Sequence, residues 1–353
     1  MRILIVSDAW TPQVNGVVRT LTTVADELRA MGHTVEVIGP DRFRTIPAPT
    51  EPSVRLALFP GRRLRRLVDD FRPDAIHIAT EGPLGLAARR LCLARGWPFT
   101  TAFHTRFPEY LRARLGIPES LTWRLMRRFH APSAAVLVAT PSLHRELATR
   151  GFRNVAAWTR GVDLALFRPR EDRTGFGLPR PVFLYVGRVA VEKNIEAFLA
   201  LDLPGSKVVV GDGPARPSLE KRFPAAHWLG AKFGEELARA YAEADVFVFP
   251  SRTDTFGLVL IEALACGTPV AAYPVPGPLD VIDGAPVGVL DEDLGRAATA
   301  AIALDRAACR AYAEGFSWRR CAEILLERLA PIPQPAAPDQ GLRFEQPSAA
   351  AAD

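Results

Sequence analysis

The chain has 353 residues, of which 48% are hydrophobic and 24% are charged, and these values are typical of a globular protein large enough for two domains. No apolar run approaches the roughly 18 residues needed to span a bilayer, which argues against a membrane-spanning protein. The four cysteines form neither a CxxC pair nor a metal-binding spacing, which excludes a zinc module and favours a reduced, cytoplasmic protein.

The net charge of +5 is unevenly distributed along the chain. Residues 1–165 contain 24 arginines, no lysine and 14 acidic residues, whereas the remainder contains 20 basic and 25 acidic residues. This asymmetry suggests that the first half meets an anionic surface. A general bias towards arginine codons is the alternative explanation.

The first half alternates strand and helix patterns. Its opening, MRILIVSDAW, has five apolar residues before Ser7, too few for a signal peptide, and predicts a first strand. Further strands are predicted over 34–39, 74–80, 98–104 and 134–141, with helices over 17–32, 83–96 and 142–151. Such alternation predicts a doubly wound parallel sheet.

The same pattern restarts after a segment rich in Pro, Arg and Gly at 163–180. Strands are predicted over 181–188, 207–213 and 245–251, with helices over 195–203, 235–244, 256–265 and 316–329. We therefore expect an α/β protein of two Rossmann-like domains, 1–165 and 166–329, that face a central ligand cleft. The last helix, 316–329, is a candidate to pack back on the first domain, and the Pro/Ala-rich stretch 331–353 is predicted to be disordered.

The segment RTDTFGLVLIEALACGTPV, residues 252–270, carries the most informative pattern. Asp254 lies in a strand-to-helix loop and Glu262 about a turn and a half inside the following helix. Open α/β sheets bind ligands at this end of their strands. The amides of Phe256, Gly257 and Leu258 open the helix, and such free amides favour an anion such as phosphate.

Other candidate positions have ordinary structural explanations as well. Asn15-Gly16 after the first strand lets the backbone approach a phosphate, although a simple turn is the commoner role of such a pair. Arg188 and Lys193 could grip a diphosphate, unless Glu192 simply pairs with Lys193 in a solvated loop. His104 ends a strand and is either a structural or a ligand-binding histidine.

Several of these motifs occur in the order of a known family. They are Gly16 after the first strand, FHTRFPEYL, TRGVDLALFRP, VGRVAVEKN, GDGPAR and PSRTDTFGLVLIEALACGTPV. From about residue 1 to residue 329 the chain resembles the retaining GT-B glycosyltransferases of family 4. The subgroup to which it is most similar comprises the bacterial mannosyl-, glucosyl- and glucuronosyltransferases that glycosylate lipids, with the sulfoquinovosyl-diacylglycerol synthases.

The Gly-Asp-Gly of 211–213 also permits either close packing or close approach of a ligand.

The resemblance implies a role for each candidate residue. Asp254 would face the donor sugar, in place of the usual glutamate, and Glu262 would hold the nucleotide ribose. The helix start at Phe256, Gly257 and Leu258 would bind the β-phosphate. The diphosphate would be contacted by Arg188, Lys193 and Gly16. His104 would contact the donor sugar. A front-face mechanism without a metal is implied, and no DxD motif precedes the donor site.

The expected activity is transfer of a hexose from GDP-mannose, a UDP-hexose or a UDP-hexuronate to an acceptor such as diacylglycerol or a glycolipid. A sugar-nucleotide epimerase or hydrolase and an inactive sugar-nucleotide-binding protein are the alternatives. The sequence lacks the glycine fingerprint of a nicotinamide oxidoreductase, and it contains no recognition motif that would support nucleic-acid binding.

Peripheral binding to the anionic inner face of the cell membrane is also expected. It rests on two arginine-rich segments, 61–72 and 120–130. In the second, Leu121, Leu125 and Phe129 would form one apolar stripe bordered by Arg124, Arg127 and Arg128. Ordinary core helices with solvated arginine faces are the alternative.

Overall fold

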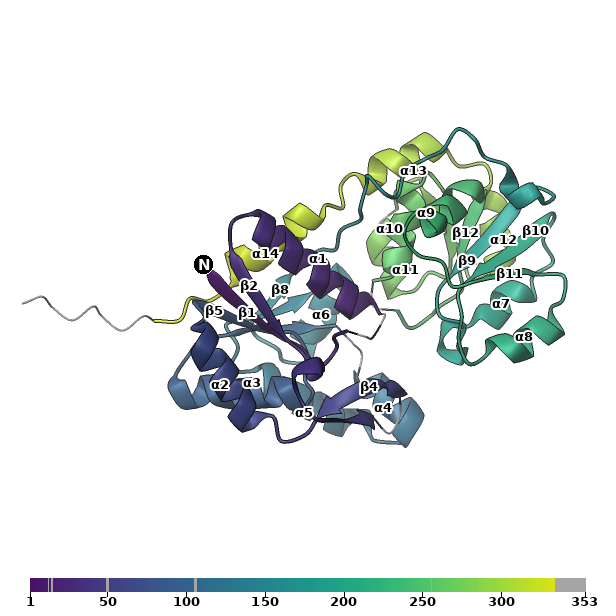
Figure 1. Ribbon diagram of the computed structural model, residues 1–353. Helices are drawn as coiled ribbons and strands as arrows, with labels where there is room; N and C mark the ends of the chain where they lie inside the picture. Colours follow the sequence, from purple (N-terminus) through teal and green to yellow (C-terminus); the bar gives the residue numbers. More distant parts are fainter. Residues whose placement is uncertain are drawn as a thin grey trace, which may run out of the picture.

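The computed structural model describes residues 1–333 except 12, 14, 49–50, 105–106, 255 and 283. It contains two six-stranded parallel sheets, one in each half of the chain, with helices on both faces (Figure 1). The predicted doubly wound α/β class is therefore confirmed.

The N-terminal sheet has the strand order β2-β1-β5-β6-β7-β8. Its strands are β1 (Arg2–Val6), β2 (Thr34–Ile38), β5 (Ala75–Ile78), β6 (Thr100–Phe103), β7 (Ala135–Val138) and β8 (Val155–Ala157). Its helices are α1 (Gly16–Ala30), α2 (Gly61–Phe71), α3 (Pro83–Arg95), α4 (Phe107–Leu115), α5 (Glu119–His130) and α6 (Pro141–Thr149), with a 3-10 turn η1 (Pro40–Arg42). An antiparallel hairpin that the sequence did not predict, β3 (Thr45–Ala48) with β4 (Glu51–Ala57), precedes α2.

Alternate residues of β1 face opposite layers of the N-terminal domain. Ile3 and Ile5 pack towards α1, whereas Leu4 and Val6 pack towards α2 and α3. A strand buried on both faces must be apolar throughout, which is why this strand reads as a continuous hydrophobic run.

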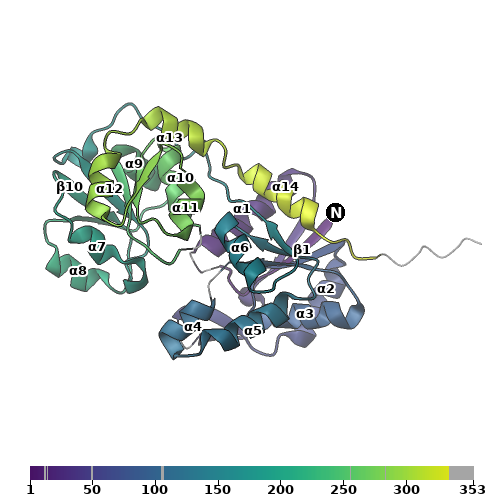
Figure 2. The ribbon, with the colours of Figure 1, turned by 180° about the vertical axis from the view of Figure 1, so that it is seen from behind.

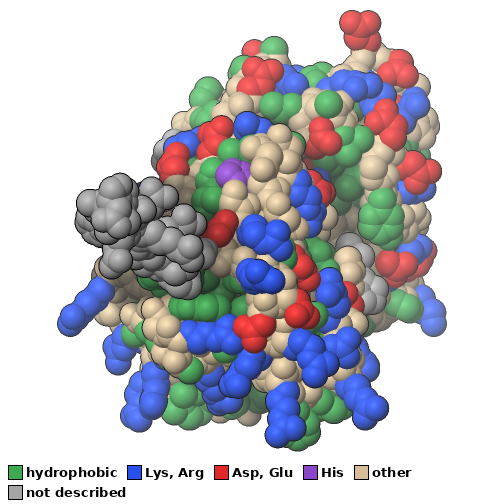
Figure 3. All heavy atoms as spheres, turned by 60° about the vertical axis from the view of Figure 1, so that its left-hand side comes forward, with side chains coloured by type: hydrophobic (Ala, Val, Ile, Leu, Met, Phe, Trp, Pro, Cys, Tyr) green, Lys and Arg blue, Asp and Glu red, His purple; other side chains and the backbone are tan. Residues whose placement is uncertain are grey.

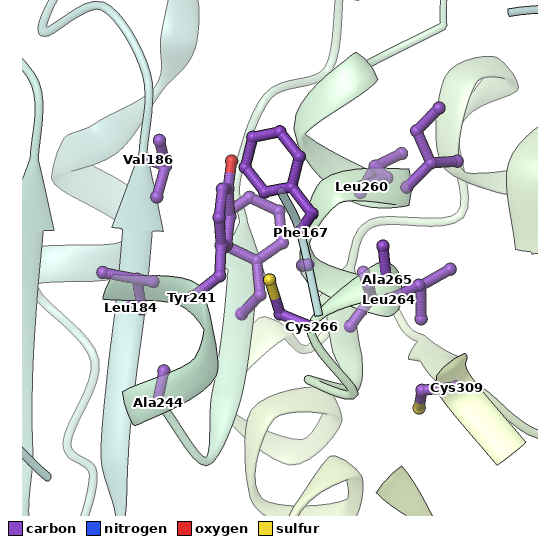
Figure 4. Close-up of a cluster of buried hydrophobic side chains, with 14 of the residues drawn as sticks. Phe167, Leu184, Val186, Tyr241, Ala244, Leu260, Leu264, Ala265, Cys266 and Cys309 are labelled. Carbon is purple, nitrogen blue, oxygen red and sulfur yellow. The ribbon is translucent and has the colours of Figure 1, made fainter. Parts of the chain in front are cut away.

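The C-terminal sheet has the order β11-β10-β9-β12-β13-β14. Its strands are β9 (Val182–Val186), β10 (Ser206–Val210), β11 (His227–Gly230), β12 (Val246–Phe249), β13 (Val270–Ala272) and β14 (Gly288–Leu290). Its helices are α7 (Ile195–Leu199), α8 (Arg216–Arg222), α9 (Gly234–Glu243), α10 (Leu258–Ala265), α11 (Pro276–Ile282), α12 (Leu294–Ala301) and α13 (Arg306–Ala313), with 3-10 turns η2 (Gly175–Gly177) and η3 (Val191–Lys193). Figure 4 shows its core, in which Phe167 and Tyr241 lie beside Leu184 and Leu260.

The last helix, α14 (Trp318–Arg328), lies on the N-terminal domain in both ribbon views (Figures 1 and 2). Trp318 and Leu325 belong to the same buried cluster as Leu21 and Leu28 of α1. The indole nitrogen of Trp158 also donates to the carbonyl of Cys321 at 2.9 Å. The chain therefore crosses between the domains twice.

Two sequence-based boundaries were wrong. The helix predicted over 195–203 ends at Leu199, because Lys207 Nζ donates to the carbonyls of Leu199 and Leu201 and so satisfies the helix end. The tail predicted to be disordered from 331 is ordered at its start, where the Ile332 amide donates to the Asp74 carbonyl at 2.7 Å and its side chain is buried. Residues 334–353 of that tail lie outside the described residues.

The Gly-Asp-Gly turn after β10 serves close packing of two loops. A Cβ on Gly211, whose φ is 147°, would stand 1.9 Å from the carbonyl oxygen of Gly187. The Val189 amide donates to the Asp212 carbonyl at 2.9 Å across the same contact. Glycine is required here because the loop that carries Arg188 lies against this turn.

Candidate active site

The loop that follows β9 carries the two predicted cations. Arg188 follows Gly187 in this loop, with 44% of its side chain exposed and its guanidinium 3.7 Å from the carboxylate of Glu192. The hydroxyl of Tyr185 donates to the Arg188 carbonyl at 2.8 Å, which fixes the backbone of this loop. Lys193 ends the short turn η3.

Lys193 pairs with Asp254, whereas the solvated-loop alternative paired it with Glu192. Its Nζ lies 2.5 Å from Asp254 Oδ1. The two residues meet because β9 and β12 are neighbours in the sheet, so the loops at their carboxyl ends are neighbours too. Asp254 Oδ2 is buried and has no hydrogen-bond partner among the described residues. An acceptor of this kind is well suited to a ligand hydroxyl.

The start of α10 follows Asp254 directly. Gly257 precedes the helix with φ 80°, a left-handed conformation that glycine adopts without strain. Among the described residues, no side chain caps this helix start. Phe256 is buried against the ring of Phe316, with centroids 6.3 Å apart, and this contact anchors the loop. The helix start can therefore offer amides to an anion.

The start of α1 in the other domain faces the start of α10. Gly16 is the first residue of α1, and a Cβ on it would stand 3.8 Å from Leu258 Cδ1. The side-chain oxygen of Asn15 accepts from the amides of Val17 and Val18, at 3.0 Å each. Asn15 is thus an N-cap, and two of the first amides of α1 are already satisfied.

Glu262 lies inside the protein with two partners that the sequence did not reveal. One is the guanidinium of Arg19, from α1 of the N-terminal domain. The other is the hydroxyl of Tyr241, which donates to Glu262 Oε2 at 2.9 Å. Burial raises the pKa of the Glu262 carboxyl, and both partners oppose that shift. A nucleotide ribose would have to share or replace these contacts.

A second contact joins the two domains. Asp280 of α11 accepts from the Ser142 amide at 3.0 Å and from its hydroxyl, at the first turn of α6. An acidic side chain is favourable there because it satisfies amides at a helix N-terminus.

His104 lies just after β6 and contacts a buried arginine. Its Nδ1 is 3.2 Å from Arg160 Nη2, and its ring lies 5.6 Å from that of Trp158. Burial, then Arg160, holds the pKa of His104 well below 6.5, so the imidazole is neutral at physiological pH. Because Arg160 is a donor only, Nδ1 must accept, and the ring proton then resides on Nε2.

The predicted residues thus form one tight group, with Gly16, Glu262 and His104 outside it. Arg188, Lys193, Asp254 and the start of α10 lie together at one edge of the C-terminal sheet. Gly16 and Glu262 lie where the domains meet. The contacts of His104 given above are with residues of the N-terminal half and not with Asp254 or Lys193.

Sequence reasoning missed Arg19, Arg160 and Tyr241. Each falls in an ordinary helix or loop pattern, and its partner is at least 21 residues away. The sequence carried no local signal for these contacts. Within the described residues there is also no group of three or more His, Cys, Asp or Glu side chains placed to hold a metal ion.

Comparison with known proteins adds to this geometry. Residues 14–166 match the family model described as Glycosyltransferase Family 4, and residues 180–306 match the model described as Glycosyl transferases group 1. A GDP-mannose-dependent alpha-mannosyltransferase from Mycobacterium tuberculosis is 34% identical over 320 residues, which cover 82% of this chain and 83% of that protein. The chain belongs to glycosyltransferase family 4.

Two further similarities extend this assignment. An alpha-monoglucosyldiacylglycerol synthase from Acholeplasma laidlawii is 27% identical over 319 residues, covering 76% of this chain and 79% of that protein. The solved structure of sucrose-phosphate synthase from Thermosynechococcus elongatus superposes with a TM-score of 0.75 at 22% identity, over 92% of this chain and 97% of that one. The glycosyltransferase therefore has the expected GT-B fold and is a hexosyltransferase. The matches support transfer and give no support to the epimerase, hydrolase or inactive-protein alternatives.

Proposed function

We propose that this family 4 enzyme transfers a hexose, with retention of configuration, from GDP-mannose, a UDP-hexose or a UDP-hexuronate to a membrane lipid such as diacylglycerol or a glycolipid. The observation that carries the donor site is the Lys193–Asp254 pair beside Arg188 and the start of α10. The cations and the helix N-terminus suit a diphosphate, and the carboxylate oxygen without a hydrogen-bond partner suits a hydroxyl of the attached sugar.

The proposed chemistry follows from where charge develops. The bond from the anomeric carbon to the phosphate oxygen breaks, and negative charge builds on the diphosphate. Arg188 and Lys193 stabilise that charge more strongly in the transition state than in the bound donor, which lowers the barrier. The acceptor hydroxyl attacks the same face of the sugar, and its proton passes to the departing phosphate oxygen. No metal is invoked in this scheme.

The sugar itself is held from both domains in this proposal. Asp254 Oδ2 accepts from a donor-sugar hydroxyl, and His104 donates from Nε2–H to another. Glu262 receives the ribose hydroxyls once Arg19 moves aside or shares the carboxylate. Gly16 approaches the diphosphate from the start of α1.

A lipid acceptor is supported by the relatives and by the surface of the N-terminal domain. One relative is a monoglucosyldiacylglycerol synthase by name. In Figure 3 basic side chains gather along the lower surface of the N-terminal domain, with hydrophobic side chains between them, and they are arginines because residues 1–165 contain no lysine. No helix of the described residues is long and apolar enough to cross a membrane. The lipid-acting relative and the arginine-rich surface support our proposal of a peripheral protein on the cytoplasmic face of the membrane.

The test has two stages. Melting temperatures are measured against GDP-mannose, UDP-glucose, UDP-galactose and UDP-glucuronate, because a donor at about 100 times its Kd adds roughly 2.7 kcal/mol of stability. The donor that binds is then incubated with diacylglycerol vesicles, and the product is identified by mass spectrometry and its anomeric configuration by NMR. Release of free sugar without glycolipid, or an inverted product, would contradict the proposal.

A further inference from the structure

The loop between β12 and α10, which we call the Asp254 loop, rests on the first turn of α11. Gly277 of that helix is buried, and a Cβ on it would stand 2.9 Å from the Asp254 carbonyl oxygen and 3.5 Å from that of Phe256. Only glycine allows two backbones to approach this closely. The position of Asp254 is therefore set by the position of α11.

The same helix carries the contact that Asp280 makes with the N-terminal domain. Asp280 Oδ1 accepts from the Ser142 amide at 3.0 Å, and Oδ2 accepts from the Ser142 hydroxyl. Both carboxylate oxygens thus bind one residue at the start of α6. The N-cap of α6 is already supplied by Thr140, whose hydroxyl accepts from the Leu143 amide at 3.3 Å. The carboxylate of Asp280 therefore adds a bond between the domains to a helix that has its own cap.

The far end of α11 is fixed within the C-terminal domain. The side chains of Val281 and Ile282 are buried in its core. The hydroxyl of Tyr312 donates to their carbonyls, at 2.8 Å and 3.3 Å. In both ribbon views α11 lies on the side of the C-terminal domain that is turned towards the N-terminal domain (Figures 1 and 2). Because close-packed elements transmit displacement, α11 connects Ser142 to the Asp254 loop as one rigid piece.

A second contact links the domain junction to the same loop. Phe316 lies in the second crossing between the domains, and its carbonyl accepts from the amide of Val162 in the first crossing at 3.1 Å. Its ring packs against that of Phe256 with centroids 6.3 Å apart, and against that of Tyr312 with centroids 5.7 Å apart. Asp254 and Phe256 are therefore each in contact with a segment whose position depends on how the domains dock.

We propose that Asp280 is a positioning residue for hexosyl transfer. By binding Ser142 it fixes α11 between the domains, and α11 sets the position from which the Asp254 carboxylate meets the donor sugar. The inference rests on the proposed function in taking Asp254 to face that sugar, whereas the coupling of Ser142 to the Asp254 loop is a property of the unliganded protein. A carboxylate misplaced by about 1 Å orients the sugar poorly, so the loss falls on kcat and not on binding of the nucleotide.

The coupling is measured first on the full chain without any sugar nucleotide. Hydrogen exchange with mass spectrometry reports the opening of backbone amides in the peptide 246–260, which spans β12, the loop and the start of α10. Ser142→Ala and Asp280→Asn weaken the contact, and Ser142→Thr keeps the hydroxyl. Asp293→Asn is the matched control, because Asp293 accepts from two amides at the start of α12 in its own domain. We expect exchange about tenfold faster in the two weakened variants and unchanged in the other two.

Initial rates then show whether the contact serves transfer. Asp280→Asn should lower kcat about tenfold, while the affinity for GDP or UDP, whichever wild type binds, stays within about twofold. Adding Ser142→Ala should cause no further loss, because both changes act on one contact. Gly277→Ala should also lower kcat, since its Cβ displaces the Asp254 carbonyl and leaves Ser142 and Asp280 unaltered. Gly61→Ala, at the start of α2, is its control, because a Cβ there meets no described atom within 4 Å. Urea denaturation confirms that each variant is folded.

Three outcomes would overturn the proposal. Unchanged exchange in the peptide 246–260 would mean that the contact does not reach the Asp254 loop. Lower stability of Asp280→Asn with normal kcat would assign Asp280 a purely structural role. Weaker nucleotide binding with normal kcat would place its effect at Glu262 and not at Asp254. Absence of glycolipid product from wild type, together with faster exchange in the variants, would instead contradict the proposed function and support the coupling.

Discussion

Arg19 of α1 and Glu262 of α10 form an ion pair that joins the two domains, with the carboxylate almost wholly buried. The Arg19 guanidinium also lies 5.5 Å from the centre of the Phe167 ring, in the segment where the chain passes from one domain to the other. A buried carboxylate needs such a partner, because the loss of hydration would otherwise favour its neutral form. The residue predicted to meet the ribose is thus also a contact between the domains.

Replacing Arg19 tests this pair directly. Arg19→Gln should lower the free energy of unfolding by about 2 kcal/mol, less than for a fully buried pair because 37% of the Arg19 side chain is exposed. Urea denaturation gives the value. Arg29→Gln on the same helix, whose pair with Asp26 is exposed, should cost under about 0.5 kcal/mol. Equal losses of unfolding free energy in the two variants would show that the Arg19–Glu262 pair contributes no more to stability than an exposed pair.

The two carboxylates should differ in what they do. Glu262→Ala is expected to weaken binding of the nucleoside diphosphate, whereas Asp254→Ala should mainly lower kcat. Ribose contacts persist through the reaction, while contacts to the sugar change as its ring flattens. Titration calorimetry with the diphosphate, alongside initial rates, separates the two. Wild-type affinity in Glu262→Ala would rule out the ribose role.

Arg188 and Lys193 should each be needed for departure of the diphosphate. Arg188→Ala or Lys193→Ala is expected to reduce kcat/KM about 100-fold, since loss of one preorganised contact to developing charge costs roughly 3 kcal/mol. Arg222→Ala, which removes an exposed arginine paired with Glu196, serves as the control. Near-normal turnover in both site variants would mean that the diphosphate binds elsewhere.

Arg160 should control the protonation of His104. In Arg160→Gln the pKa of His104 is expected to rise while remaining below 6.5, because burial, the larger cause of its depression, stays. A raised pKa brings protonation to higher pH, so the acidic limb of the pH–kcat/KM profile should move upward in the variant. NMR titration of the imidazole checks the same shift without turnover. A profile identical to that of wild type would assign Arg160 a purely structural role.

His77 should make the fold sensitive to acid. Burial, with Arg160, lowers the pKa of His77 from 6.5 to about 3, so the unfolded chain takes up a proton between these values and the folded protein does not. Stability from this group is therefore present above pH 6.5 and is lost as pH falls, by about 1.4 kcal/mol per pH unit. Because the Glu262 pKa is raised, its contribution has the opposite sign.

The His77 prediction is measured as a difference between two proteins. His77→Asn offers a polar atom to Thr100, whose hydroxyl lies 2.9 Å from His77 Nδ1. The free energy of unfolding of wild type should fall more steeply than that of the variant between pH 6.5 and pH 5. If the free energies of unfolding of wild type and variant changed in parallel with pH, His77 would titrate alike in the folded and unfolded states.

The sequence by itself determined the two sheets and the grouping of Arg188, Lys193 and Asp254. Continuous apolar runs such as 3–6 and 246–249 are legible because burial on both faces leaves no polar position. Arg188, Lys193 and Asp254 could be placed together because the loops at the carboxyl ends of neighbouring parallel strands meet at one edge. Periodicity and motif spacing are local properties, and both are visible in the chain.

Only the tertiary structure decided which side chains pair across the fold. Arg19 meets Glu262, Arg160 meets His104, and Phe129 turns inward while Leu121 and Leu125 stay outside. In the sequence Arg19 is one more polar residue of an amphipathic helix, and the leucines of α5 are indistinguishable from its core residues. The reason is physical. An ion pair between residues 243 positions apart depends on how two domains dock, and docking is set by packing that no local pattern encodes.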